Sequence, residues 1–128
     1  MRKTEPGMSP FWDYIGMTEE IIEEGYAELR LNITPNLTQR RGTVHGGVLA
    51  SLVDAAVGSA VRSTLSKEQA SATVELKVNY VRPAKGVYLI GKAKLFQQGK
   101  TLAAGQAEIF NSDGNLVAIG TATYMILT

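Results

Sequence analysis

An acidic residue, Asp54, stands inside an apolar run of the sequence, between Val53 and Ala55. Burial of an unpaired carboxylate is costly, so an acid kept in such surroundings is a candidate for acid–base or nucleophilic chemistry. The structural alternative is an ion pair with Arg62, eight residues further along. Eight residues of helix rise ~12 Å, which is too far for direct pairing within one helix. The partner of Asp54 must therefore come from elsewhere in the fold, from another chain or from a ligand.

A second candidate lies upstream, where the chain's only histidine, His45, precedes the pair Gly46-Gly47. Here a polar loop turns into a helix, so the glycine N–H groups are among the four that have no partner inside the helix. They can hold a negatively charged oxygen. Around an attacked carbonyl they become an oxyanion hole, worth ~3–4 kcal/mol per donor. The structural alternatives are a tight corner for the glycines and a hydrogen-bonding role for His45.

The spacing of these groups limits how they can work together. Asp54 follows Gly46 by eight residues, and that helical rise of ~12 Å keeps Asp54 from a carbonyl held at Gly46 of the same chain. Two such helices packed antiparallel across a two-fold axis would bring the helix start of one chain beside Asp54 of the other, twice per dimer. The sequence therefore predicts that a catalytic site here is built from two chains.

The elements that must position these residues can be predicted from periodicity. Residues 46–63 are apolar nearly all round and contain no proline, which predicts a helix wrapped by other structure. Residues 25–33 alternate apolar and polar side chains, as a half-buried strand does, and residues 34–45 form a polar, basic loop. Ser9 and Pro10 predict a short helix over residues 11–17, as an N-cap followed by proline at the first helical position.

The second half of the chain predicts four more strands, joined mostly by hairpins, over residues 72–81, 87–96, 101–110 and 116–127. Together these elements predict an α+β fold, in which one antiparallel sheet curls around one buried helix. We find no internal repeat and no linker. We therefore expect a single domain over residues 1–128, with residues 1–8 as a flexible tail.

The amino-acid composition excludes several classes of function. With 45% hydrophobic and 20% charged residues, the chain belongs to the globular class rather than the disordered one. A net charge of +1 gives no general attraction to nucleic acid or to a membrane surface. The absence of cysteine excludes thiolate chemistry and disulfides, and one histidine argues against zinc. With no membrane span and no secretory signal, we expect a cytoplasmic protein.

Several motifs, in order along the whole chain, resemble the signature of the hotdog-fold acyl-CoA thioesterases: Gln39-x-x-Gly42-x-x-His45-Gly46-Gly47, Leu52-Val53-Asp54, Tyr80-Val81-Arg82-Pro83-Ala84, Gln98-Gly99-Lys100-Thr101 and Gly120-Thr121-Ala122-Thr123. The nearest branch is that of the phenylacetate-pathway and Arthrobacter-type 4-hydroxybenzoyl-CoA thioesterases. The resemblance implies a hotdog fold, with five to six strands curled around one long central helix. It implies hydrolysis of an acyl-CoA thioester to a free acid and CoA, with CoA as part of the substrate and no metal or redox cofactor.

The resemblance also implies roles for particular residues. Asp54 matches the catalytic carboxylate, acting either as nucleophile or as general base for water. Gly46 N–H matches the oxyanion donor, Gln39 a side chain that contacts the carbonyl or orients the water, and His45 the histidine beside the oxyanion site. Thr73 matches a small residue near the reacting group, from the partner chain. The substrate-binding residues implied are Gly47, Gly58, Thr73, Tyr80, Arg82, Pro83, Gln98, Gly99 and Lys100.

The basic groups among them suit CoA, which is a polyanion. The alternative for Arg82 and Lys100 is that they are ordinary solvated turn residues.

Position 58 departs from the family pattern. Relatives often carry serine or threonine one turn after the acid, where this chain has Gly58. We expect Gly58 to open room beside the acid for a bulkier acyl group, so that Gly58→Thr shortens the preferred acyl chain. A second departure is Asp54 itself, since several relatives carry glutamate there.

Two other functions compete with hydrolysis. A hotdog dehydratase or hydratase uses a catalytic histidine in a different local setting. A non-catalytic acyl-CoA-binding protein is disfavoured because Asp54 in apolar surroundings lowers stability without a structural return. For the acyl-CoA thioesterase we expect a homo-oligomer, either a dimer or a dimer of dimers. The acyl group stays open between an aryl ring and a medium chain, for which Phe11, Trp12 and Tyr14 are candidate pocket residues.

Overall fold

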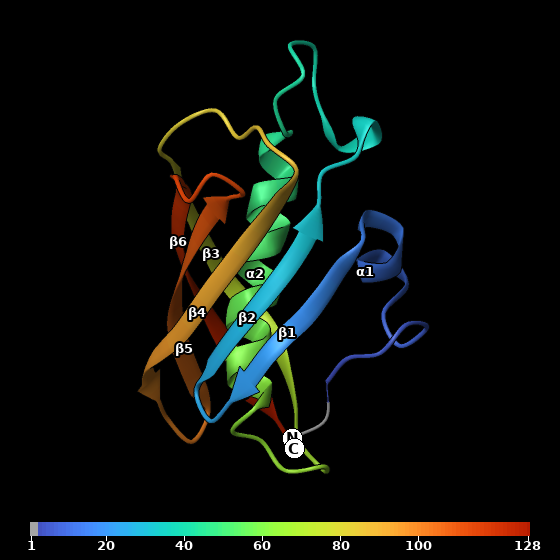
Figure 1. Ribbon diagram of the computed structural model, residues 1–128. Coiled ribbons are helices and arrows are strands. Elements are labelled where there is room, and N and C mark those ends of the chain that lie inside the picture. The colour runs from blue at the N-terminus through green and yellow to red at the C-terminus, as the bar shows by residue number, and fades with distance from the viewer. Residues whose placement is uncertain (1–2) are drawn as a thin grey trace.

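A computed structural model describes residues 3–128 as one six-stranded antiparallel sheet that curls around the helix α2 (Gly46–Arg62) (Figure 1). The strands are β1 (Met17–Glu23), β2 (Tyr26–Asn32), β3 (Ala70–Tyr80), β4 (Tyr88–Gln98), β5 (Leu102–Asn111) and β6 (Leu116–Leu127). They lie in the order β1-β2-β4-β5-β6-β3. Two short elements complete the fold, the helix α1 (Pro10–Ile15) and the 3-10 turn η1 (Pro35–Leu37). The expected α+β hotdog architecture is confirmed.

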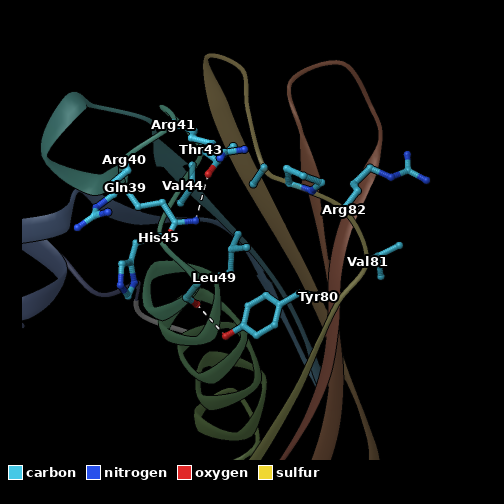
Figure 2. A pocket seen from close by; sticks show the side chains of 13 residues that line it. Gln39, Arg40, Arg41, Thr43, Val44, His45, Leu49, Tyr80, Val81 and Arg82 are labelled. Carbon is cyan, nitrogen blue, oxygen red and sulfur yellow. Dashed lines mark hydrogen bonds between the residues drawn. The ribbon is translucent and has the colours of Figure 1, made fainter.

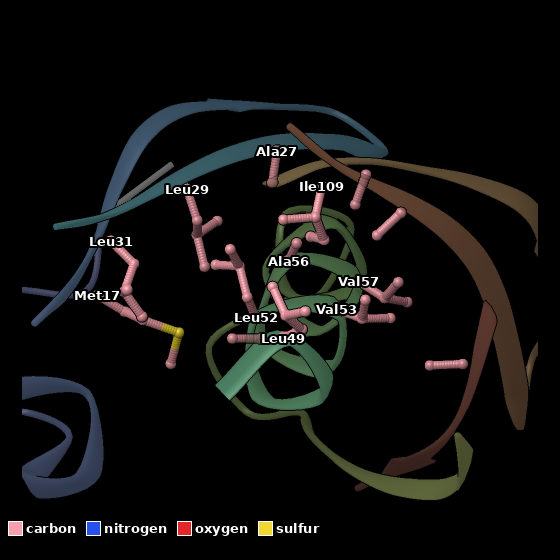
Figure 3. Packing of buried hydrophobic residues seen from close by; sticks show 14 of the residues in the cluster. Met17, Ala27, Leu29, Leu31, Leu49, Leu52, Val53, Ala56, Val57 and Ile109 are labelled. Carbon is pink, nitrogen blue, oxygen red and sulfur yellow. The ribbon is translucent and has the colours of Figure 1, made fainter. Parts of the chain in front are cut away.

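The core lies between the inner face of the sheet and α2 (Figure 3). Leu29 from β2 and Ile109 from β5 pack with Leu52, Val53 and Val57 of the helix, and all five side chains are fully buried. Glycines in the sheet let the helix approach closely. A Cβ added at Gly120 would lie 2.8 Å from a methyl carbon of Val53. The sheet wraps the helix, and this explains why nearly every face of the helix is apolar.

The two predicted helices and the five predicted strands are all present, although the first helix ends at Ile15 and Met17 already belongs to β1, a strand that the sequence did not predict. Its pairing register with β2 shifts between Glu19 and Ile21, so a bulge interrupts the strand. The bulge changes which side chains face inward: Met17 and Glu19 are buried, whereas Ile21 is exposed. Simple alternation of apolar and polar residues is therefore lost, and an inward carboxylate further obscures the strand pattern.

The N-terminal segment is attached to the fold. Helix α1 begins at Pro10 and ends before Gly16, whose left-handed φ of 83° favours glycine. Before it, the Lys3 ammonium donates a hydrogen bond to the carbonyl of Glu20 at 2.9 Å, and Thr4 donates from its N–H to the buried Glu19. Residues 3–8 thus differ from the expected flexible tail, and residues 1–2 lie outside the described part of the chain.

The two edges of the sheet differ in character. Edge strand β1 carries the exposed acids Glu20 and Glu23, and such charges discourage pairing with another strand. Edge strand β3 has no buried residue along its length. Its inward-facing Leu76 and Tyr80 are 38% and 55% exposed, although the Tyr80 hydroxyl contacts the start of α2. In residues 3–128, no helix is both long and apolar enough to span a bilayer.

Candidate active site

The start of α2 is organised by His45. This residue is the N-cap, and its Nδ1 accepts a hydrogen bond from the Gly47 N–H at 2.9 Å. A ring nitrogen that accepts carries no hydrogen in that hydrogen bond, so Nε2 is the ring nitrogen left to donate. The Gly47 N–H is therefore occupied within the chain. In the part of the chain that the structure describes, no group accepts from the Gly46 N–H, which leaves this donor for a ligand.

The loop before α2 holds Gln39 near the helix start. A tight turn brings Gln39 back to Thr43, and Gly42 makes the turn with a left-handed φ of 78°. The Gln39 side-chain amide donates to Thr43 Oγ1 at 3.1 Å. Val44, which is buried, donates its N–H to the carbonyl of Ala84 at 2.9 Å. The loop is thus fixed to the β3–β4 connection, where Arg82 and Pro83 lie.

These segments enclose a cleft of about 920 Å³ (Figure 2). Gln39 and His45 lie on one side of it, and Tyr80 and Arg82 lie on the other. The Tyr80 hydroxyl donates to the carbonyl of Gly46 at 2.9 Å, and its ring would lie 3.3 Å from a Cβ added there. Six of the predicted site residues line this one cleft: Gln39, His45, Gly46, Tyr80, Arg82 and Pro83.

The charge of this cleft is uniform. Three arginines line it, namely Arg40, Arg41 and Arg82, and no acidic residue is among its lining residues. Guanidinium groups form bidentate, charge-assisted hydrogen bonds with phosphates and carboxylates. The cleft is therefore suited to an anionic group that lies beside the helix start.

Asp54 lines a different, smaller cavity of about 260 Å³. Other groups that line it include Phe11 and Trp12 of α1 and Gly58 of α2. Asp54 does not line the larger cleft. Within one chain, the helix start and the carboxylate are therefore separate, as the helical rise between them requires.

Two hydroxyl groups hold the Asp54 carboxylate from the sheet. Thr73 Oγ1 donates to Asp54 Oδ1 at 2.8 Å, and the Tyr124 hydroxyl donates to the same oxygen at 2.6 Å. Thr73 and Tyr124 are directly opposite each other in the register of β3 and β6. The bulge of β3 comes immediately after Thr73. The two donors thus form a single cross-strand pair under the helix, and Thr73 lies beside Asp54 of its own chain.

Tyr124 was not among the predicted site residues. A signal for it exists in the sequence, because alternation along residues 116–127 puts this position in phase with the inward-facing Gly120 and Ala122. Burial raises the pKa of the Tyr124 hydroxyl, and the hydrogen bond to Asp54 raises it further. The hydroxyl is consequently a neutral donor at physiological pH.

The expected open space at Gly58 is wrong. A Cβ added at Gly58 would lie 2.5 Å from the Tyr124 hydroxyl oxygen and 3.0 Å from the ring carbon that bears it. The space that the missing side chain leaves beside the acid is therefore filled by tyrosine, although the Gly58 backbone still lines the small cavity next to Asp54.

Arg62 has a partner other than Asp54. It pairs with Glu19 of β1, whose carboxylate also accepts from Ser59 Oγ at 2.6 Å. Burial raises the pKa of the Glu19 carboxyl, but the hydrogen bonds from Arg62, Ser59 and Thr4 outweigh it and hold the pKa below its usual value. The ion pair considered for Asp54 is thus absent, and Arg62 instead stabilises a buried acid on the edge strand.

The predicted turn Gln98–Lys100 lies far from the cleft within one chain. Thr64, just beyond the end of α2, donates to Gln98 Oε1 at 3.0 Å. Figure 1 shows the β4–β5 turn at the opposite end of the sheet from the loop that precedes α2. Gln98, Gly99 and Lys100 therefore do not join Arg82 at one surface of a single chain.

The chain was compared with known proteins. The thioesterase superfamily matches residues 41–118. The medium/long-chain acyl-CoA thioesterase YigI of Salmonella typhimurium is 31% identical over 132 residues, which cover 91% of this chain and 85% of YigI.

Solved structures agree with this match. A thioesterase family protein from Silicibacter pomeroyi is 33% identical, with a TM-score of 0.88 over 93% of this chain and 90% of that protein. A Bacillus halodurans protein, whose structure was solved with CoA, is 36% identical, with a TM-score of 0.76 over 78% of this chain and 66% of that one. The fold, the matched segment and these relatives agree, and the chain belongs to the thioesterase superfamily of hotdog-fold enzymes.

Proposed function

We propose that the protein hydrolyses an acyl-CoA thioester to a free acid and CoA, in sites that each combine the helix start of one chain with Asp54 of its partner. The observation that carries the proposal is the position of Asp54. Two hydroxyl donors hold this carboxylate, yet it lies outside the cleft that contains the unpaired Gly46 N–H. Both groups suit acyl transfer, and a second chain is needed to bring them together.

Strand β3 supplies the surface for that second chain. Its outer edge has unpaired N–H and C=O groups, and its inward-facing Leu76 and Tyr80 are left uncovered. Antiparallel pairing of β3 with its copy across a two-fold axis extends the sheet and covers these side chains. It also turns the two α2 helices antiparallel. The start of each helix then faces Asp54 of the other chain, and a dimer of dimers would contain four such sites.

In this arrangement the Gly46 N–H donates to the thioester carbonyl and stabilises the oxyanion that forms on attack. Asp54 either takes a proton from the attacking water or attacks the carbonyl itself. In both cases the C–S bond breaks, CoA leaves as a thiolate that takes up a proton, and water completes the free acid. The chemistry needs no metal or redox cofactor, so we expect activity to survive dialysis against a chelator.

The arginine-lined cleft is proposed to bind the CoA portion of the substrate. Arg40, Arg41 and Arg82 provide positive charge next to the helix start, with no acid among the lining residues. CoA carries several phosphate charges, for which arginine is a favoured partner. The bound CoA in the Bacillus halodurans relative supports this class of ligand.

The decisive experiment measures thiol release from aryl, short, medium and long acyl-CoAs, with wild type beside Asp54→Asn. Asparagine keeps the shape of the side chain and removes its charge. We expect turnover of at least one acyl-CoA by wild type and a loss of ~10²-fold or more in the variant. Asp113→Asn, an exposed acid in the β5–β6 turn, is the matched control and should leave the rate unchanged. Equal rates in Asp54→Asn and wild type would contradict hydrolysis by this site.

A further inference from the structure

Gly58 and Tyr124 fit each other beside the proposed catalytic carboxylate. Gly58 lies one helical turn after Asp54, on the same face of α2. The Tyr124 hydroxyl oxygen occupies the place where a side chain at position 58 would begin, 2.5 Å from an added Cβ. Tyr124 is only 6% exposed, and Gly58 lines the cavity that Asp54 also lines. A hydroxyl group is thus delivered to this spot from the sheet.

We propose that Tyr124 is a positioning residue, which orients the Asp54 carboxylate in place of a hydroxyl carried by the helix at position 58. The proposal rests on the proposed function, because it assigns how the carboxylate of that site is held. It concerns two residues of this chain that act as a unit: glycine on the helix makes the space, and tyrosine on β6 fills it with a donor.

The geometry of the hydroxyl explains how it orients the acid. Its oxygen lies 2.6 Å from Asp54 Oδ1 and 2.6 Å from the Asp54 carbonyl oxygen. A tyrosine hydroxyl has one hydrogen to donate, and a carboxylate is the stronger acceptor of the two. The hydrogen therefore goes to Oδ1, while the hydroxyl oxygen also lies against the carbonyl of the same residue. The Tyr124 hydroxyl thus sets the position of Oδ1 relative to the sheet.

A second hydroxyl, that of Thr73, also holds the Asp54 carboxylate. Thr73 donates to the same Oδ1, so both donors hold one carboxylate oxygen. Within residues 3–128, no hydrogen bond reaches the other oxygen, Oδ2. One oxygen is thus anchored to the sheet, and the other is left for the attacking water or for the thioester carbon. Burial raises the pKa of the Tyr124 hydroxyl and keeps it a donor.

Four variants test the pair by thiol release. Tyr124→Phe removes one oxygen and should lower kcat roughly 10- to 100-fold, the usual effect of losing a hydrogen bond to a charged group, with KM within about twofold. Gly58→Ser in the wild-type background should also lower kcat, because the new side chain displaces the Tyr124 hydroxyl. The double variant Gly58→Ser with Tyr124→Phe supplies a hydroxyl from the helix, and should recover most of kcat.

The fourth variant, Gly58→Ala with Tyr124→Phe, is the matched control. It differs from the rescuing variant only by the serine oxygen, and it places the same Cβ beside the ring. Since the phenylalanine ring stays about as close to position 58 as the tyrosine ring, both double variants need the same small shift of the ring. We expect rescue by serine and none by alanine. Full activity in Tyr124→Phe, or equal rescue by alanine, would overturn the positioning role.

A measurement without substrate separates this proposal from the proposed function. Unfolding of Tyr124→Phe, Asp54→Asn and the double variant gives the coupling between the two residues. A non-zero coupling supports the contact, and a coupling of zero overturns the positioning role even if hydrolysis is fast. If no acyl-CoA turns over in wild type, the proposed function fails, and the positioning role fails with it whatever the coupling.

Discussion

Gly46 and Asp54 belong to one helix, yet each lines a cavity that the other does not reach. The larger cavity contains positive charge and an unpaired backbone N–H, and the smaller contains an anchored carboxylate. In the proposed mechanism neither half completes acyl transfer alone, since a donor for the oxyanion and an acid or base are both required. The division of the site along α2 is the basis of the following predictions.

Gly46→Pro should remove the oxyanion donor and keep the helix. Proline lacks an N–H and is well tolerated at the first helical position, which Gly46 occupies. The ψ of 137° at His45 also suits a following proline. We expect kcat to fall ~10²- to 10³-fold, as when one oxyanion donor is lost. The melting temperature, measured in parallel, should change little. An unchanged kcat would show that this N–H does not serve the reaction.

Mixing two inactive variants should restore activity. In a dimer of one Asp54→Asn chain and one Gly46→Pro chain, one site has both defects and the other has neither. Unfolding and refolding an equal mixture should therefore give roughly a quarter of the wild-type rate, by random pairing into a two-fold dimer. Each variant refolded alone is the control. If the mixture stays as inactive as its components, the site lies within one chain.

Leu76→Lys should disrupt the proposed dimer. This side chain faces inward on the uncovered edge strand β3, and a charge there would be buried against a partner. Ile21→Lys, on the opposite edge strand β1, is the matched control, because Ile21 is 39% exposed and Leu76 is 38% exposed. Light scattering should detect monomers for Leu76→Lys only. Thiol release should likewise be lost in Leu76→Lys only. Dimers in both variants would place the interface elsewhere.

Acid should destabilise the protein partly through Glu19. The pKa of Glu19 in the folded chain is below its ordinary value of 4.5, so the unfolded chain binds protons more readily. The stabilisation is thus present above that value and is lost as the pH falls through the folded pKa. Glu19→Gln should be less stable near neutral pH, and its melting temperature should fall less than that of wild type below about pH 4.5. Glu20→Gln, an exposed neighbour on the same strand, should behave as wild type does.

Periodicity was enough to predict most of the fold. The strand over residues 25–33 stands out because its burial alternates with a period of two, and the helix over residues 46–63 because its apolar run is long and contains no proline. Strand β1 was missed because its bulge breaks the period and an inward glutamate occupies an apolar position. The pairing of Glu19 with Arg62 could not be predicted for the same reason, since it depends on where β1 lies.

Spacing along the chain predicted the part of the candidate site whose residues are close in sequence, and the family resemblance added Tyr80, Arg82 and Pro83, which line the same cleft. Gln39, His45 and Gly46 belong to one loop-to-helix segment, and they do line one cleft. Tyr124 reaches Asp54 because β6 lies next to β3 and faces the helix. The order of strands in a sheet cannot be predicted from the spacing of residues along the sequence. The prediction of open space at Gly58 was wrong for that reason. A glycine indicates that its own side chain is absent, and does not indicate which residue fills the space.

One wall of the cavity beside Asp54 comes from α1, a segment that carries none of the proposed reactive groups. Phe11 and Trp12 line it from α1, whereas Asp54, Thr73 and Tyr124 are held by the central helix and the sheet. The wall joins the rest of the chain through the glycine turn at Gly16. We propose that this cavity receives the acyl group of the substrate, so substitutions in the first turn of α1 should change acyl preference while the Asp54 carboxylate stays in place. Under this proposal, selectivity and reactivity vary at separate positions.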